Sequence, residues 1–179
     1  MKKLLIALAA VMVSVASYGQ GQVVFANLVG TAVNAPVMLQ GTDHGPGAGY
    51  SSQLFLQGAN GALTALTPAS TFRPAGVGAA AIADRYWLSQ TVDVPVTPGA
   101  NATFVVRAWK TSLGSYDAAV ASKSDFGFSS PVTVAVGGGT LPPSNLVGLQ
   151  GFSVNQVPEP STIALGLLGV AAMALRRRK

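Results

Sequence analysis

The chain has 179 residues, with eleven lysines and arginines, six aspartates and glutamates, and no cysteine. Without cysteine, the sequence excludes disulfides, thiol nucleophiles and cysteine-ligated metal centres. Six of the basic residues lie at the two ends, and residues 4–155 hold five basic and five acidic residues. This neutral centre excludes the clustered cations that nucleic-acid binding requires, so no nucleic-acid partner is expected.

The N-terminus has the pattern of a secretory signal peptide. Two lysines precede an uninterrupted apolar run over residues 4–13, and small residues follow. A basic start, a short apolar centre and a small-residue cleavage site are the parts of such a peptide, and lysines directly ahead of an apolar run do not suit a buried core helix. We predict a signal peptide over 1–19, export through the Sec translocon and cleavage by signal peptidase. Cleavage is expected after Ala16, with Gly19 as the second choice.

The first half of the body consists of short apolar pieces separated by turn residues. An Asn-Gly pair at 60–61 is the strongest short-range signal for a β-hairpin, and it predicts that the strands on either side pair with each other. The strands expected in this half cover 22–27, 35–40, 50–57 and 63–66, with a glycine-rich loop at 41–49.

The second half begins with a segment at 80–88 that we expect to be irregular and to end in a strand. Pro95 favours an edge position for the strand at 91–96, because proline cannot donate to a strand ladder. The segment 102–110 is the best strand candidate and is expected to be central in its sheet, with long side chains reaching out at its ends.

A short helix is expected over 115–123, where Ser115 can cap the first turn. In this helix Tyr116, Ala119 and Val120 would share one face. The last two strands are expected at 130–136 and 146–154.

This spacing of short strands and turns predicts an all-β fold. We expect an antiparallel β-sandwich over residues 20–155, with jelly-roll and immunoglobulin-like topologies both open. The N-terminal signal helix and a C-terminal transmembrane helix would flank this domain.

Few residues of the body are candidates for catalysis. His44, the chain's one histidine, lies beside Asp43 in the glycine-rich loop, but a metal site needs several converging ligands. No Gly-x-Ser-x-Gly elbow is present. The four other aspartates stand beside a basic residue or a turn, which is typical of surface carboxylates and not of a facing catalytic pair; they are Asp84, Asp93, Asp117 and Asp125. We expect no enzymatic activity, no metal and no cofactor.

Aromatic residues offer a different kind of site. Their rings can stack on sugars at a sandwich surface, and nearby basic residues can add hydrogen bonds. The alternative is that the tryptophans pack in the core, where each buries a large apolar area while its N–H reaches a partner. The pattern favours the core but leaves stacking open. The stacking candidates are Trp87 and Trp109, with Tyr86 and Tyr116, and the basic residues are Arg107 and Lys110.

The C-terminus has three parts. Val157-Pro158-Glu159-Pro160-Ser161 is expected to be extended, because each proline fixes φ and keeps the preceding residue out of the helical region. The apolar run 162–175 is predicted to be a membrane helix. It is short for a span, which needs about 20 residues, but can insert by snorkelling and local thinning. The basic end, which is expected to stay cytoplasmic, comprises Arg176, Arg177, Arg178 and Lys179.

These three parts together resemble the PEP-CTERM protein-sorting signal of Gram-negative bacteria over residues 156–179. The resemblance implies recognition by an exosortase, a membrane cysteine protease that would act at or near Pro158-Glu159-Pro160. It also implies transient membrane anchoring, then release or transfer, and a link with exopolysaccharide and biofilm. The body is similar to short Gly/Ala-rich sandwich proteins that carry this tail, through Gln20-Gly21-Gln22-Val23-Val24-Phe25-Ala26-Asn27.

The sequence thus predicts a protein exported across the inner membrane, anchored there for a time, and then placed at the cell surface or in the extracellular matrix. We expect a non-enzymatic role with exopolysaccharide as a partner. A carbohydrate-binding module that stacks sugars on Trp and Tyr rings is the alternative.

Overall fold

The computed structural model describes residues 20–155, apart from the side chains of residues 78–80. The predicted signal peptide with its cleavage sites and the sorting segment 156–179 lie outside the described residues. The described part is mostly β, as predicted. Within residues 20–155, no helix has the length and apolar character needed to cross a membrane.

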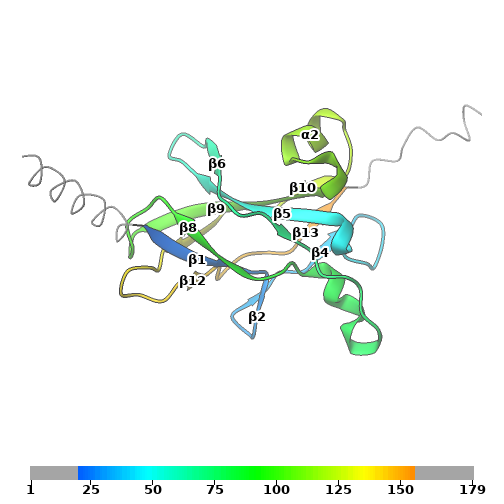
Figure 1. Ribbon diagram of the computed structural model, residues 1–179, viewed down its shortest axis with the longest axis horizontal. Coiled ribbons are helices and arrows are strands. Elements are labelled where there is room, and N and C mark those ends of the chain that lie inside the picture. Colours follow the sequence, from blue (N-terminus) through cyan, green and yellow to red (C-terminus); the bar gives the residue numbers. More distant parts are fainter. Residues whose placement is uncertain (1–19, 156–179) are drawn as a thin grey trace, which may run out of the picture.

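The strands follow one another with short helices between them (Figure 1). The strands are β1 (Gly21–Phe25), β2 (Leu28–Val29), β3 (Val33–Asn34), β4 (Val37–Leu39), β5 (Tyr50–Gln57), β6 (Leu63–Ala65), β7 (Ser70–Thr71), β8 (Gln90–Val94), β9 (Asn101–Lys110), β10 (Phe126–Phe128), β11 (Val132–Ala135), β12 (Ser144–Asn145) and β13 (Phe152–Val154). The helices are η1 (Gly47–Gly49), η2 (Gly78–Arg85), η3 (Thr111–Leu113) and α2 (Tyr116–Ala121).

Two sheets pack against each other across one core. The smaller has the order β12-β1-β8, and the larger has the order β10-β9-β5-β6, with β11 also paired to β9 and β7 to β5. Val23 and Val92 of the smaller sheet and Leu54 of the larger are fully buried in the same cluster. Figure 1 shows β1 and β8 on one side and β5 and β9 on the other. Strand β8 is an edge strand, as Pro95 predicts.

The antiparallel pair β5–β9 is the longest ladder of the fold. Its register runs from Tyr50 opposite Lys110 to Gln57 opposite Thr103. Phe104, Val106 and Ala108 are fully buried on the inner face, because successive side chains of a strand point to opposite faces. The strand predicted at 102–110 is confirmed as a central strand, and the hairpin predicted around the Asn-Gly pair is confirmed by β5 and β6.

Two strand pairs are parallel, so the predicted antiparallel arrangement is confirmed for the other strand pairs and wrong for these two. Strand β12 runs parallel to β1, and β13 runs parallel to β4. The single strand predicted at 146–154 is also wrong, because the chain turns at Gly148, whose φ is 93°, and only then forms β13. Parallel strands cannot be joined by a tight hairpin, and here the partners are far apart in the chain, since β1 and β4 precede β5 whereas β12 and β13 follow β11. Strand β12 joins the smaller sheet, and β13 forms a separate two-stranded sheet with β4.

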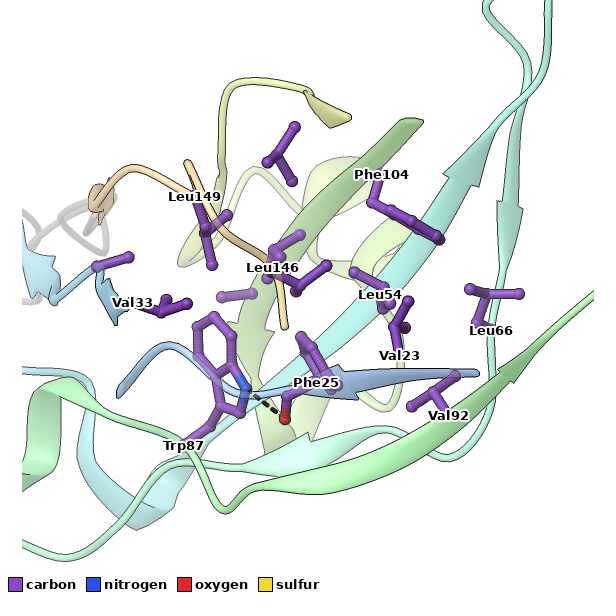
Figure 2. Packing of buried hydrophobic residues seen from close by; sticks show 14 of the residues in the cluster. Val23, Phe25, Val33, Leu54, Leu66, Trp87, Val92, Phe104, Leu146 and Leu149 are labelled. Atoms are coloured by element: carbon purple, nitrogen blue, oxygen red, sulfur yellow. Dashed lines mark hydrogen bonds between the residues drawn. The ribbon is translucent and has the colours of Figure 1, made fainter. Parts of the chain in front are cut away.

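Phe25 and Trp87 form the aromatic centre of the core (Figure 2). Their ring centroids are 4.8 Å apart, and the Trp87 Nε1–H donates to the Phe25 carbonyl at 3.3 Å. Phe72 meets the Trp87 ring edge-on, with centroids 5.7 Å apart. The segment 80–88 therefore begins within η2 and then places Trp87 in the core. There the backbone of Trp87 forms an isolated antiparallel β-bridge with Phe72.

Asn27 connects three segments from a fully buried position. Its Nδ2 donates to the carbonyls of Ala35 at 2.9 Å and Arg85 at 3.0 Å, and its Oδ1 accepts from the Trp87 N–H at 3.1 Å. Strand β1 ends at Phe25, two residues before the predicted end. Beyond it the Asn27 side chain satisfies backbone groups that a strand ladder would otherwise have to pair.

Candidate functional site

Helix α2 covers one end of the outer face of the larger sheet (Figure 1). Its cap is the predicted one, since Ser115 Oγ accepts from the Ala118 N–H at 3.1 Å. Tyr116 and Ala119 are buried against Trp109 in a second, small core. Val120, which was predicted to share this face, is 41% exposed and is not part of this small core.

Beside α2 the outer face is hollowed into a groove of about 220 Å³, which we call the outer groove. Its polar lining comes from Gln57 of β5, Arg107 of β9 and Tyr116 of α2, with Ser129 after β10. Its apolar lining comes from Leu63, Val105, Phe128 and Pro131. Of the described residues that line the outer groove, only Arg107 is charged.

The Arg107 guanidinium packs against two aromatic rings. Its Cζ lies 4.7 Å from the centroid of Phe55 and 4.4 Å from the centroid of Tyr116. Arg107 Nη1 is also 3.7 Å from Asp117 Oδ1, but the Asp117 side chain is 92% exposed. The rings therefore fix the orientation of the guanidinium, whereas the ion pair is long and screened by solvent.

Phe128 places an exposed ring beside this guanidinium. Phe128 is directly opposite Arg107 in the β9–β10 ladder, so the two side chains share the outer face. Its side chain is 61% exposed. The next residue, Ser129, is buried, and its Oγ accepts from the Val106 N–H at 3.0 Å and donates to the Ser130 carbonyl at 2.9 Å. These bonds fix the chain directly after Phe128.

Strand β10 and Phe128 were not predicted from the sequence. The available signal is the alternation Phe126-Gly127-Phe128, in which the middle position must be small. A Cβ at Gly127 would collide with the Ser153 carbonyl of β13. The glycine thus lets β10 approach β13 closely and leaves Phe128 on the outer face.

Burial raises the pKa of the Tyr116 hydroxyl above its ordinary value of 10.0. The positive charge of Arg107 acts in the opposite direction, and the negative charge of Asp117 raises the pKa further. The phenol is therefore neutral at physiological pH, and it lines the outer groove as a group that can both donate and accept a hydrogen bond.

The favoured prediction that Trp87 and Trp109 pack in the core is confirmed, and the stacking alternative is wrong for both. They are only 1% and 4% exposed, since Trp87 lies in the main core and Trp109 lies beneath α2. Tyr86 is also buried, with its hydroxyl bonded to Asn34. Of the four predicted stacking rings, Tyr116 is the one that lines the outer groove.

Asp43 and His44 lie in an exposed turn. The turn is tied to η2 by the Arg85 guanidinium, which donates to the Asp43 carbonyl at 2.6 Å, and by the Gly45 N–H, which donates to Asp84 Oδ2 at 3.0 Å. Among residues 20–155, no three His, Cys, Asp or Glu side chains gather where they could hold a metal ion.

Two aspartates predicted to be at the surface are buried instead. Asp84 is 4% exposed and Asp125 is 9% exposed. Each carboxylate has a specific donor, Gly45 N–H for Asp84 and the Tyr50 hydroxyl for Asp125, the latter at 2.7 Å. One oxygen of each carboxylate is thus held by a structural hydrogen bond, which offsets part of the cost of burying a charged group, while Asp84 Oδ1 is buried with no partner among the described residues.

Residues 156–179 match a family model described as the PEP-CTERM protein-sorting motif. The chain carries a PEP-CTERM sorting motif. The matched range contains the predicted Val157–Ser161 segment, the apolar run and the basic end. The motif supports exosortase-dependent sorting of an exported protein, with the sorting signal at its C-terminus. Neither a curated protein nor a solved structure matches the chain.

A second hollow of the protein lies between β11 and β12 and measures about 520 Å³. The described residues that line it are small, aliphatic or polar, and none of them is charged or aromatic. Thr133, Pro142 and Val147 are three of these lining residues. The outer groove is therefore the hollow that combines a fixed cation with an exposed ring.

Proposed function

We propose that this PEP-CTERM protein is a non-enzymatic component of the cell surface or extracellular matrix, associated with exopolysaccharide or biofilm. The sorting motif at 156–179 is the observation that carries the proposal, because it marks the chain as cargo and places the catalytic groups of sorting on the exosortase. The signal peptide predicted at 1–19 supplies the route across the inner membrane. The body contributes a β-rich unit, which we interpret as a β-sandwich, built around a single main core.

Processing tests this proposal directly. In cells that contain an exosortase, we expect the mature protein to have lost the C-terminal tail and to be recovered from the surface or matrix fraction. Replacing Pro158-Glu159-Pro160 with three alanines should leave the tail in place and the protein in the membrane fraction. Pro142→Ala, in the body, is the control and should be processed normally. Intact mass spectrometry reads both termini, and unchanged processing of the triple-alanine variant would contradict the proposal.

Carbohydrate binding is the second candidate function, and the outer groove is the observation that favours it. The groove offers an exposed aromatic ring, an arginine and a tyrosine hydroxyl on one face of the larger sheet. Aromatic faces and planar hydrogen-bond donors are the groups with which proteins hold sugar rings. In this form the function depends on Phe128, Arg107 and Tyr116, and no longer on either tryptophan.

A further inference from the structure

We propose that the outer groove binds a carboxylate-bearing sugar, such as a uronate unit of an acidic polysaccharide. This inference rests on the second candidate function and names its ligand class. It follows from three observations: the positive charge of Arg107 in the groove, the contacts that orient its guanidinium, and the exposed ring of Phe128 on the same face.

The cation of the groove is positioned for a carboxylate. Phe55 and Tyr116 hold the Arg107 guanidinium at 4.7 and 4.4 Å, so little conformational freedom remains to be lost when a ligand binds. A planar guanidinium matches a carboxylate through two parallel hydrogen bonds, which a neutral sugar hydroxyl cannot form.

The existing partner of Arg107 is easily displaced. Asp117 Oδ1 is 3.7 Å from Arg107 Nη1, beyond hydrogen-bonding distance, and its side chain is 92% exposed. An exposed pair of this kind contributes little to stability. A ligand carboxylate can therefore replace Asp117 at Arg107, and Asp117 acts as a weak internal competitor for the site.

The rest of the groove suits a sugar ring. Phe128 shares the outer face with Arg107 and is 61% exposed, which leaves its ring available to the apolar face of a pyranose. Gln57 and Tyr116 line the same groove and carry groups that hydrogen-bond hydroxyls. A saccharide with both a carboxylate and a ring uses all these groups, whereas a simple anion uses only Arg107.

The test compares an acidic sugar with its neutral ester. The full chain, purified in a non-ionic detergent, is titrated calorimetrically with trigalacturonate and with trigalacturonate methyl ester at low salt. We expect the acid to bind about tenfold more tightly than the ester, which is a modest effect for one charge-assisted bidentate contact.

Four variants separate the contributions. Arg107→Gln should lower the affinity for the acid to that of the ester, and Arg107→Lys should fall between Arg107→Gln and the parent. Phe128→Ala should weaken both ligands by the same factor. Asp117→Asn should tighten binding of the acid by about two- to fivefold and leave the ester unchanged, because it removes the competing carboxylate. Val147→Ala, an exposed position outside the groove, is the control and should bind like the parent.

Asp117 and Phe128 are exposed, so their variants should keep the fold. These two variants therefore still test whether the outer groove binds an acidic sugar, even if an Arg107 variant does not fold. Equal affinity for acid and ester, with both lowered by Phe128→Ala, would overturn the carboxylate inference and leave carbohydrate binding standing. If neither sugar binds, the carboxylate inference and the proposal of carbohydrate binding are both overturned. If a short peptide binds through its free C-terminal carboxylate more tightly than the acidic sugar does, the ligand is the C-terminus of a protein and the sugar assignment is overturned. None of these results depends on the processing assay.

Discussion

The guanidinium of Arg107 lies 4.4 Å from the centre of the Tyr116 ring, and this contact fastens α2 to the outer face of β9. The same two residues line the outer groove. One contact therefore holds a structural element in place and orients the cation that we assign to ligand binding. Its strength should depend on the protonation of Tyr116.

The stability of the protein should fall at high pH partly through Tyr116. Its pKa in the folded state is raised above 10.0, chiefly by burial. The neutral phenol is thus favoured by folding, and its contribution is fully present below the unfolded pKa and lost as the pH rises through the folded pKa. We expect Tyr116→Phe to flatten the decline in unfolding free energy between about pH 9 and pH 11. Urea unfolding at several pH values measures this slope.

The comparison is made between slopes, because lysines and the other tyrosines also titrate in this range and affect both proteins equally. Identical slopes for the parent and Tyr116→Phe would show that Tyr116 does not couple folding to pH.

The two tryptophans should respond differently to the same substitution. Trp87→Phe removes the donor to the Phe25 carbonyl and leaves a gap in the main core, at a cost of about 2–4 kcal/mol. Trp109 Nε1 is buried, and none of the described residues accepts its hydrogen bond. Trp109→Phe removes this unpaired N–H and should therefore cost at least about 1 kcal/mol less.

These variants change the chain's only two tryptophans, so denaturation is best followed by circular dichroism. Each variant serves as the control of the other, since the change in side-chain volume is the same. A larger loss for Trp109→Phe than for Trp87→Phe would mean that the unpaired N–H has a partner in solution.

Local sequence patterns were enough to predict the elements that depend on nearby residues. The Asn-Gly pair predicted the β5–β6 hairpin, and Ser115 predicted the start of α2. The alternation in 102–110 identified β9 because its pattern is long and bounded by turn residues.

The remaining features depend on residues that are far apart in the chain. Strands β12 and β13 have two and three residues, too few for a periodic pattern, and their parallel partners lie at the other end of the domain. The burial of Asp84 follows from Gly45, 39 residues away. Phe128 faces solvent only because β10 pairs with Arg107 of β9, so the outer groove could not be found before the register was known.

Asn27 should be among the most sensitive polar positions of the body. Asn27→Ala leaves the Ala35 and Arg85 carbonyls and the Trp87 N–H buried without their side-chain partner. Loss of this network should lower the free energy of unfolding by about 3 kcal/mol or more, because each buried group left unpaired costs roughly 1–3 kcal/mol. Asn101→Ala, at the exposed first residue of β9, should change stability by less than about 0.5 kcal/mol. A loss at Asn27 no greater than that at Asn101 would contradict the connecting role of Asn27.

The packing of the exposed turn onto η2 can be tested with two glycines of the same loop. At Gly45 an added Cβ would collide with the backbone of Asp84 and Arg85, whereas at Gly49 nothing lies within 4 Å and the backbone is not in the left-handed region. Gly45→Ala must push the turn away from η2 and weaken the Gly45 bond to Asp84, so we expect a loss of about 1–3 kcal/mol. Gly49→Ala should be neutral or stabilise by up to about 1 kcal/mol, because alanine restricts the unfolded chain. Denaturant midpoints of the two variants give the difference. If both behave alike, the turn does not pack on η2 in solution, and Asp84 must then be reached by water.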